Sequence, residues 1–343
     1  MFLQNRWYAV AWDHEITGKP LGRTICGEKI VFYRKADRSV VALEDCCPHR
    51  LLPLSKGFVK NDQLVCGYHG ITFGDEGQCV HMPNQEAINP NAHIRPYPVA
   101  QRYRFVWVWI GEAALADESK LPHMPWCEGE DWAFDGGTYH IGCDYKLLVD
   151  NLMDLTHETY VHPSSIGQEE ITEAPIETTS DSETVTVSRW MYDIAPPPFW
   201  AHNLRSTAQV DRWQICHFNL PANVFIDVGV ALAGTGAAEG DRSQGVSATV
   251  VDLMTPETET TTWYHWGFAR DFEVKDQGLT LRIKEGQAKI FAEDLDVLEA
   301  QQQNILDRPD RKLLTFNIDA GGMRARRIIE RAIEAQAATI AAE

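Results

Sequence analysis

The first third of the chain alternates short apolar runs with turn-forming residues. Gly, Pro and Asp separate these runs, which is a pattern typical of short β-strands. The clearest runs are Ile30–Tyr33, Val40–Leu43, Leu64–Cys66 and Phe105–Ile110. Residues 1–120 are therefore expected to form a small all-β domain. The stretch 112–129, which contains Pro122 and Pro125, is the expected domain boundary.

The remaining residues, 121–343, combine helical and strand patterns. Residues 144–162 have helical spacing, and the pattern stops at Pro163. The expected strands are 184–190, Val224–Leu232, Ser247–Met254 and Thr260–Ala269, and the expected later helices are Leu279–Ile305 and Arg324–Ala342. The two patterns together predict an α+β protein whose second domain carries both the larger sheet and the helices.

Composition narrows the classes of partner and the compartment. The formal charge is −18, because 49 acidic residues outnumber 31 basic ones, and this argues against a nucleic acid or an anionic membrane as partner. No apolar run reaches the length of a membrane span, and the N-terminus lacks the basic start and apolar stretch of a signal peptide. The eight cysteines are therefore expected in a reducing cytoplasm, where metal binding is a commoner role than disulfide formation.

Two cysteine–histidine pairs stand on short, turn-rich segments. The first is Cys47-x-His49, and the second, after a gap of 16 residues, is Cys66-x-x-His69. Two thiolates on one iron and two imidazoles on the other make a Rieske [2Fe–2S] centre. A structural zinc site is the alternative, but zinc sites favour a two-residue gap in both pairs. The spacing therefore favours the Rieske centre.

A second group of metal-binding side chains lies in the first helical pattern of the second domain. Asn151, Asp154 and His157 stand three residues apart and would share one face of a helix. His162 follows His157 by five residues, and the next residue is a proline that is expected to loosen the last turn. This loosening would bring the ring of His162 back toward that of His157.

Two histidines from one element need a third ligand from elsewhere. The acidic run near residue 294 offers three carboxylates, those of Glu293, Asp294 and Asp296. Two histidines and one carboxylate, with the other positions open, form the facial triad of non-haem iron(II) oxygenases. The alternative is a pair of ordinary helix-end histidines. The Rieske pattern upstream favours iron.

Taken together, these motifs resemble the Rieske-type aromatic oxygenases. The resemblance rests on Cys47-Pro48-His49-Arg50, on Cys66-Gly67-Tyr68-His69-Gly70 and on Asn151-x-x-Asp154-x-x-His157-x4-His162. It extends over nearly the whole chain. Residues 150–162 and 317–322 look especially like vanillate O-demethylase oxygenase subunits.

The resemblance implies which residues hold each metal. The implied cluster ligands are Cys47 and Cys66 on one iron, and His49 and His69 on the other. The implied ligands of the mononuclear iron are His157, His162 and Asp294. Glu293 and Asp296 are expected to point away from that iron, so that alanine at either position should leave it in place.

The resemblance also implies a fold and an assembly. The N-terminal domain would be the all-β Rieske domain, and the catalytic domain a helix-grip fold, in which an antiparallel sheet wraps around a long helix. Asp154 would link His69 of a neighbouring subunit to an iron-ligand histidine, which requires a ring-shaped homotrimer. Asn151, on the same predicted face, is counted with Asp154 among the catalytic residues.

Three further residues are candidates for the substrate pocket. Trp263 and His265 share one face of a predicted strand, and His265 stands where the resembled enzymes are expected to have an aromatic or apolar residue. Asp227 lies between Ile226 and Val228 and could hold a phenol in the pocket. Its alternative is a polar partner in the core.

The function that the resemblance implies is O-demethylation of a methoxylated aromatic acid, with vanillate giving protocatechuate and formaldehyde. Dioxygen would be the oxidant, and two electrons from NADH would arrive through a separate reductase with flavin and iron–sulfur groups. Two alternatives stay open. One is the same machinery acting on another methoxy, N-methyl or methyl aromatic, and the other is a Rieske electron carrier without an active site of its own.

Overall fold

The computed structural model describes residues 1–162, 171 and 174–342, and the chain divides into two compact units. The first unit contains residues 1–121 together with 255–258, and the second contains the rest. The short segment 255–258 belongs with the first unit because Thr255 Oγ1 donates a hydrogen bond to the carbonyl of Ala9 at 2.7 Å. A boundary drawn along the sequence alone has no means of assigning such a segment.

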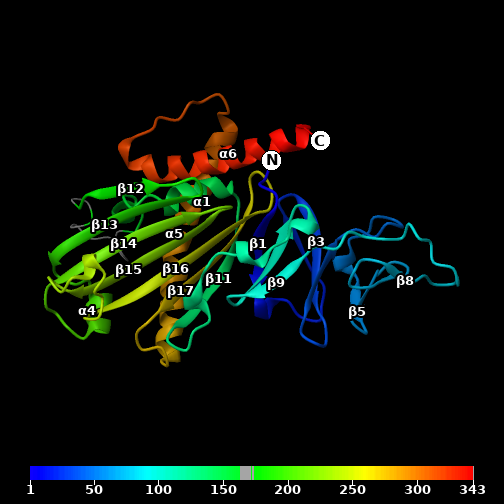
Figure 1. Cartoon of the computed structure of the whole chain (residues 1–343), viewed down its shortest axis with the longest axis horizontal. Helices are drawn as coiled ribbons and strands as arrows, with labels where there is room; N and C mark the ends of the chain where they lie inside the picture. Colours follow the sequence, from blue (N-terminus) through cyan, green and yellow to red (C-terminus); the bar gives the residue numbers. More distant parts are fainter. Residues whose placement is uncertain (163–170, 172–173, 343) are drawn as a thin grey trace. The chain divides into compact units, whose positions relative to one another are not determined.

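Three small antiparallel sheets form the first unit (Figure 1). In pairing order they are β1 (Arg6–Trp12), β10 (Phe105–Ile110) and β9 (Val99–Arg102); β2 (Leu21–Ile25), β3 (Glu28–Arg34) and β4 (Val40–Glu44); and β5 (Phe58–Lys60), β6 (Gln63–Val65), β7 (Thr72–Phe73) and β8 (Cys79–His81). Every side chain of β10 is buried, which explains why this strand is apolar without alternation. The all-β prediction for this region is confirmed.

A seven-stranded antiparallel sheet forms the body of the second unit. In pairing order its strands are β11 (Ala133–Ile141), β17 (Thr262–Arg270), β16 (Gly245–Pro256), β15 (Asn223–Leu232), β14 (Val210–Asn219), β13 (Thr184–Ile194) and β12 (Ile176–Ser180). The long helix α5 (Gln277–Asp307) packs on one face of this sheet, where Phe291 contacts the rings of Tyr264 and Trp266. This arrangement agrees with the predicted antiparallel sheet and long helix.

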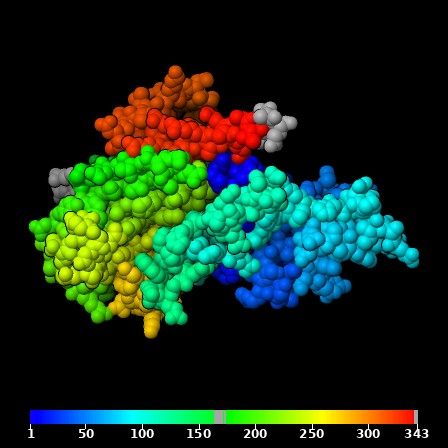
Figure 2. Space-filling view, viewed as in Figure 1, coloured from blue at the N-terminus to red at the C-terminus, as the bar shows by residue number. Residues whose placement is uncertain are grey.

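The last helix begins earlier than predicted. Helix α6 spans Ala320–Ala342, so Gly321 and Gly322 lie inside it rather than before it. A Cβ on Gly321 would come within 2.6 Å of the carbonyl oxygen of Met153, and one on Gly322 within 2.8 Å of Asp150. The glycines therefore allow α6 to pack closely on α1 (Tyr145–Leu152). Figure 2 shows α6, in red, lying directly over the green strands β12 and β13.

The predicted continuous helix 144–162 is wrong. The segment forms α1, a turn, and the short helix α2 (Glu158–Val161). The break occurs because the carboxylate of Asp154 accepts hydrogen bonds from the amide and hydroxyl of Thr156, and such a local turn competes with helix. Pro163, which was expected to loosen the last turn of this helix, lies outside the described residues. A further helix, α4 (Pro198–Leu204), starts in the proline-rich loop. None of the described helices could cross a membrane.

Candidate metal centres and substrate cavity

His157, His162 and Asp294 converge on one point of the second unit. One candidate ligand atom from each lies within 4.8 Å of the others. The Nε2 atoms of His157 and His162 stand 3.6 and 3.2 Å from Oδ1 of Asp294. The break between α1 and α2 makes this possible, because His157 and His162 flank a helix of only four residues. Two imidazoles and one carboxylate, all partly or fully buried, suit iron(II).

The other nitrogen of each histidine ring is held by an oxygen. His157 Nδ1 lies 2.6 Å from the backbone carbonyl oxygen of Asp154, which can only accept, so this Nδ1 carries the proton. His162 Nδ1 lies 2.7 Å from Oε2 of Glu293. Both rings therefore turn Nε2 toward Asp294, as metal ligation requires.

The expectation that Glu293 points away from the metal site is wrong. Glu293 and Asp294 are neighbours on α5, but the longer Glu293 side chain reaches around to His162. Burial lowers the pKa of His162, and its hydrogen bonds and charge interactions with Asp294 and Glu293 outweigh burial, so the pKa is raised. Asp296, by contrast, is exposed, as predicted.

Asn151 and Asp154 support the triad in different ways. Asn151 Nδ2 donates a hydrogen bond to Oδ1 of Asp294 at 3.0 Å, which fixes the carboxylate. Asp154 holds His157 through its backbone carbonyl, whereas its carboxylate Oδ1 binds Thr156. The predicted link from the Asp154 carboxylate to an iron-ligand histidine is therefore made by the backbone instead.

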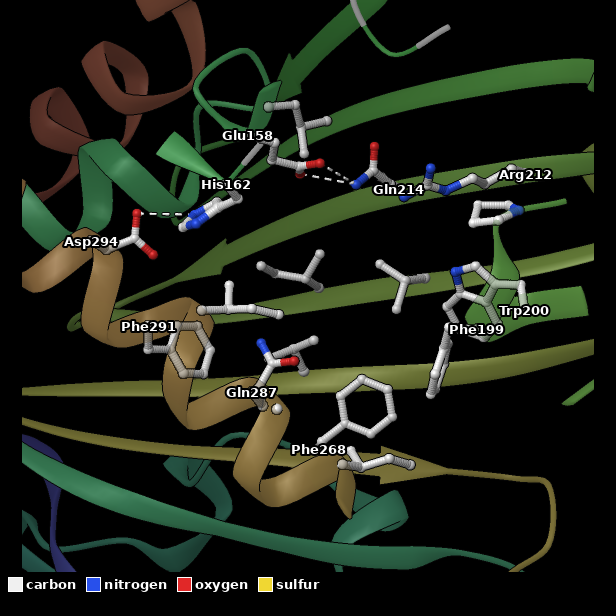
Figure 3. A pocket seen from close by; sticks show the side chains of 18 of the residues that line it. Glu158, His162, Phe199, Trp200, Arg212, Gln214, Phe268, Gln287, Phe291 and Asp294 are labelled. Carbon is white, nitrogen blue, oxygen red and sulfur yellow. Dashed lines mark hydrogen bonds and ion pairs between the residues drawn. The ribbon is translucent and has the colours of Figure 1, made fainter. Parts of the chain in front are cut away.

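A cavity of about 680 Å³ lies between the sheet and α5 and ends at this triad (Figure 3). Most of its walls are apolar or aromatic. The side chains that line it include Leu155, Phe199, Trp200, Ile226, Val228, Val250, Phe268, Leu279, Ile283, Ile290 and Phe291, with the polar groups of Glu158, Arg212, Gln214 and Gln287. Its volume is in the range of pockets that bind small organic ligands.

The three predicted pocket residues do not line this cavity. Trp263 and His265 lie on the opposite face of β17 from Phe268, and His265 Nδ1 instead meets Thr138 Oγ1 at 2.9 Å. Trp263 packs on His140, with ring centroids 4.4 Å apart.

Asp227 also faces away from the cavity, because its neighbours Ile226 and Val228 point in. It pairs with Arg242 at 2.7 Å and accepts a hydrogen bond from Trp213 Nε1. The polar-partner interpretation of Asp227 is therefore the right one. Polar groups that do line the cavity, Arg212 and Gln214, were detectable as two polar residues on the face of β14 that otherwise carries Val210, Cys216 and Phe218.

In the first unit, the two Cys–His segments form matching loops. The backbone amide of Cys47 donates a hydrogen bond to the carbonyl of Leu52, and the carbonyl of Cys47 accepts one from the amide of Leu51. Cys66 makes the same two hydrogen bonds, with Ile71 and Gly70. The fourth residue after each cysteine, Leu51 or Gly70, has positive φ, near +57° and +75°. Two unlike sequences thus give one loop shape, and the cysteines lie at equivalent positions.

The four candidate cluster ligands divide into a buried and an exposed pair. Cys47 and Cys66 are 1% and 2% exposed, whereas His49 and His69 are exposed with ring centroids 4.6 Å apart. Burial raises the pKa of the Cys47 thiol, and the adjacent Cys66 adds to this. A buried Cys47 thiolate therefore requires a positive partner, which the iron of an iron–sulfur cluster would supply.

Comparisons with known proteins identify both domains. Residues 6–98 match the Rieske [2Fe–2S] domain, and residues 141–335 match the vanillate O-demethylase oxygenase C-terminal domain. A vanillate O-demethylase oxygenase subunit from Pseudomonas sp. (strain HR199 / DSM 7063) is 51% identical over 98% of this chain and 96% of its own length. The toluene-4-sulfonate monooxygenase iron–sulfur subunit from Comamonas testosteroni is 36% identical over 98% of both chains.

A solved structure shares the whole fold. Dicamba monooxygenase bound to 3,6-dichlorosalicylic acid superposes with a TM-score of 0.92 at 32% identity, covering 98% of this chain and 99% of the other. The same enzyme has been solved with non-haem iron and dicamba, at a TM-score of 0.86. This chain accordingly uses a Rieske [2Fe–2S] cluster and a mononuclear iron. It belongs to the vanillate O-demethylase oxygenase family of Rieske monooxygenases.

Proposed function

We propose that this chain O-demethylates a methoxylated aromatic acid, with vanillate as the first candidate, and that the residues described above bind its two metals as the sequence predicts. The observation that carries the proposal is the apolar cavity that ends at His157, His162 and Asp294. The relatives are named for vanillate and toluene-4-sulfonate, and the solved neighbour for dicamba, all of which are anionic aromatics.

The reaction consumes one dioxygen, two electrons from NADH and two protons. One oxygen atom enters a methyl C–H bond, the other leaves as water, and the resulting hemiacetal splits into a phenol and formaldehyde. Bound iron supplies dioxygen activation. The apolar walls exclude water from the methyl group, while Asn151, Glu293 and the Asp154 carbonyl orient the three metal-binding side chains.

The test is a substrate panel assayed with a surrogate reductase. The panel contains methoxybenzoates, N-methyl aromatics and methyl aromatics, and formaldehyde release and NADH consumption are measured together. Equal amounts of both with vanillate support the proposal. Faster turnover of an N-methyl or aryl methyl compound would mean that such compounds, and not methoxylated acids, are the substrate class. NADH consumption without any organic product would reject the proposal.

The sequence also left open an electron carrier without its own active site, and membership of the monooxygenase family argues against it. Such a protein would need neither the triad nor the cavity, and it would bind two iron atoms per chain rather than three. Iron analysis of the purified protein, alongside the Asp294→Ala variant, separates the two functions.

We further propose a cytoplasmic homotrimer that receives electrons from a flavin and iron–sulfur reductase. Among the described residues, Oδ2 of Asp154 accepts no hydrogen bond, so it can receive one from His69 of a neighbouring chain. The exposed His49 and His69 suit such a contact. Sedimentation should show a trimer, and a fully active monomer would reject this route.

Asp154→Asn tests the bridge without removing the backbone carbonyl that holds His157. The change keeps the shape and removes the negative charge. We expect both metals to stay bound and electron transfer to fall about 10- to 100-fold, as is common when an oriented carboxylate near a metal is lost. The measurement is reoxidation of the reduced Rieske cluster in a single turnover with substrate and oxygen. Unchanged reoxidation would contradict the bridge.

A further inference from the structure

Among the described residues that line the cavity, Arg212 is a buried cation, and it lies at the end remote from the metal ligands. Figure 3 shows Asp294 and His162 at one end, and Arg212 with Phe199 and Trp200 at the other. We propose that Arg212 binds the carboxylate of the aromatic substrate, so that the methoxy group to be oxidised must stand meta or para to that carboxylate. This inference rests on the proposed function and specifies which aromatic acids fit.

The position of Arg212 follows from the strand that carries it. Arg212 and Gln214 are alternate residues of β14, so both side chains face the cavity. Gln214 Nε2 donates to both carboxylate oxygens of Glu158, at 2.9 and 2.8 Å, and Glu158 begins helix α2, which His162 directly follows. Arg212 therefore lies about 7 Å further along the strand, away from the metal ligands.

The charges around Gln214 are already matched without a substrate. Glu158 faces Arg189, with 3.7 Å between their charged atoms, and both bind Gln214. Arg189 and Glu158 thus form a closed buried group beside the cavity. Arg212 is a second buried guanidinium, only 5% exposed, and it borders the space that the substrate would fill.

A guanidinium in this place suits a carboxylate. Arginine offers five N–H donors in a planar fork that pairs with both oxygens of a carboxylate. Arg212 also interacts with the protein, and five donors allow it to keep such a contact while it binds a ligand. The aromatic side chains beside Arg212, those of Phe199 and Trp200, strengthen the attraction, because they lower the dielectric constant around the ion pair (Figure 3).

This geometry restricts the substitution pattern of the ring. If the carboxylate lies at Arg212 and the methyl group at the opposite end, the aromatic ring must separate them. Ortho substituents stand on adjacent carbons and cannot reach both ends. Meta and para methoxybenzoates are therefore expected to be substrates, and 2-methoxybenzoate is expected to be poor.

Arg282 is the competing cation near the cavity, and it serves as the matched comparison. Its side chain is 66% exposed and lies 3.8 Å from Asp276. An exposed pair of this kind attracts an anion weakly, because water screens it. The same substitution, arginine to glutamine, at positions 212 and 282 thus distinguishes carboxylate binding by a buried guanidinium from attraction by an exposed charge.

The experiment uses the holoenzyme with a surrogate reductase and compares 4-hydroxy-3-methoxybenzoate with its carboxamide. The wild-type enzyme should favour the acid in kcat/KM by at least about 30-fold, the effect of losing one partner of a buried charge pair. Arg212→Gln should bring this ratio of acid to carboxamide below about threefold. The ratio in Arg212→Lys should lie between those of the wild type and Arg212→Gln. Arg282→Gln should keep the wild-type ratio. The 3- and 4-methoxybenzoates should be turned over at least about tenfold faster than the 2-isomer.

Anaerobic calorimetry gives a readout that is independent of turnover. The dissociation constant of the acid should rise in Arg212→Gln, while that of the carboxamide stays the same. An unchanged ratio in Arg212→Gln, a ratio lost in Arg282→Gln instead, or 2-methoxybenzoate as the best isomer would overturn the inference. If no methoxy compound releases formaldehyde, the proposed function fails, and the binding constants still decide the role of Arg212. If Arg212→Gln does not fold, the wild-type comparison of acid with amide and the Arg212→Lys ratio decide it.

Discussion

The two metal centres of this chain are built from the sequence in opposite ways. The four proposed cluster ligands come from two short loops between residues 47 and 69, and each loop fixes its own shape by two backbone hydrogen bonds. The proposed mononuclear site joins His157 and His162 to Asp294, which lies on a helix more than a hundred residues later. A local site is visible in residue spacing, whereas a site assembled by tertiary packing is only partly visible.

The variant with the largest expected effect removes Asp294, the proposed iron ligand on the distant helix. Asp294→Ala should lose the mononuclear iron and at least about a thousandfold of turnover, because one of three ligands disappears. The Rieske absorption and EPR spectra should stay unchanged, since the cluster ligands lie in the other unit. Asp296→Ala, two residues away and exposed, is the control and should keep iron. Iron retained in Asp294→Ala would mean that another carboxylate is the ligand.

The second test changes a proposed ligand of the iron–sulfur cluster. His69→Cys should lower the reduction potential of the cluster by roughly 250 mV or more, because replacing imidazole by thiolate moves a Rieske centre toward all-thiolate values. The mononuclear iron should remain. His81→Cys, an exposed histidine outside the two loops, is the control. A potential that does not change, measured by a redox titration followed by EPR, would remove His69 from the ligand set.

The same contrast explains which predictions from the sequence succeeded. The cluster loops, the long helix α5 and most strands depend on local spacing and apolar periodicity, and the structure contains them. The break at Asp154 was missed because its bond to Thr156 competes with a helix that the apolar pattern also permits. Asp227 and His265 were placed in the pocket because alternation shows that two faces exist, but only long-range packing determines which face meets α5.

Glu293 shows how a helix position alone misleads. The sequence places Glu293 beside Asp294, about 100° around the helix, and this angle suggests a side chain that points elsewhere. The structure instead places its carboxylate 2.7 Å from His162 Nδ1. We expect Glu293→Ala to weaken iron(II) binding about 10- to 100-fold, and Glu293→Gln, which keeps an acceptor, to weaken it less.

The measurement for Glu293 is competition with a calibrated iron(II) chelator, which needs no turnover. Asp296→Ala again supplies the comparison on the same helix. Equal iron affinity in Glu293→Ala and Asp296→Ala would show that His162 is positioned by packing alone.

The smallest expected effects come from two buried carboxylates, one in each unit, that differ in their hydrogen bonding. In the first unit, Asp45 is 8% exposed and accepts hydrogen bonds from the amide and hydroxyl of Ser55, both at 2.6 Å. In the second, Asp252 is fully buried and accepts one from Tyr264 at 2.7 Å, while its Oδ2 has no partner among the described residues. Burial raises the pKa of Asp252 to about 8; the Tyr264 bond opposes this, and the charge of Asp294 adds to it.

A folded-state pKa above the unfolded value of about 3.9 means that the native protein holds this proton more tightly. The stability that Asp252 contributes is therefore complete below about pH 4 and is lost as the pH rises toward 8. Asp252→Asn cannot ionise and still accepts from Tyr264, so it should stabilise the metal-free protein by about 1–3 kcal/mol at pH 8 and by less at pH 5. Asp45→Asn should instead destabilise at both values, because it weakens two satisfied bonds. Calorimetric unfolding at the two pH values measures both variants, and an Asp252→Asn effect that does not grow with pH would show that this carboxyl ionises normally.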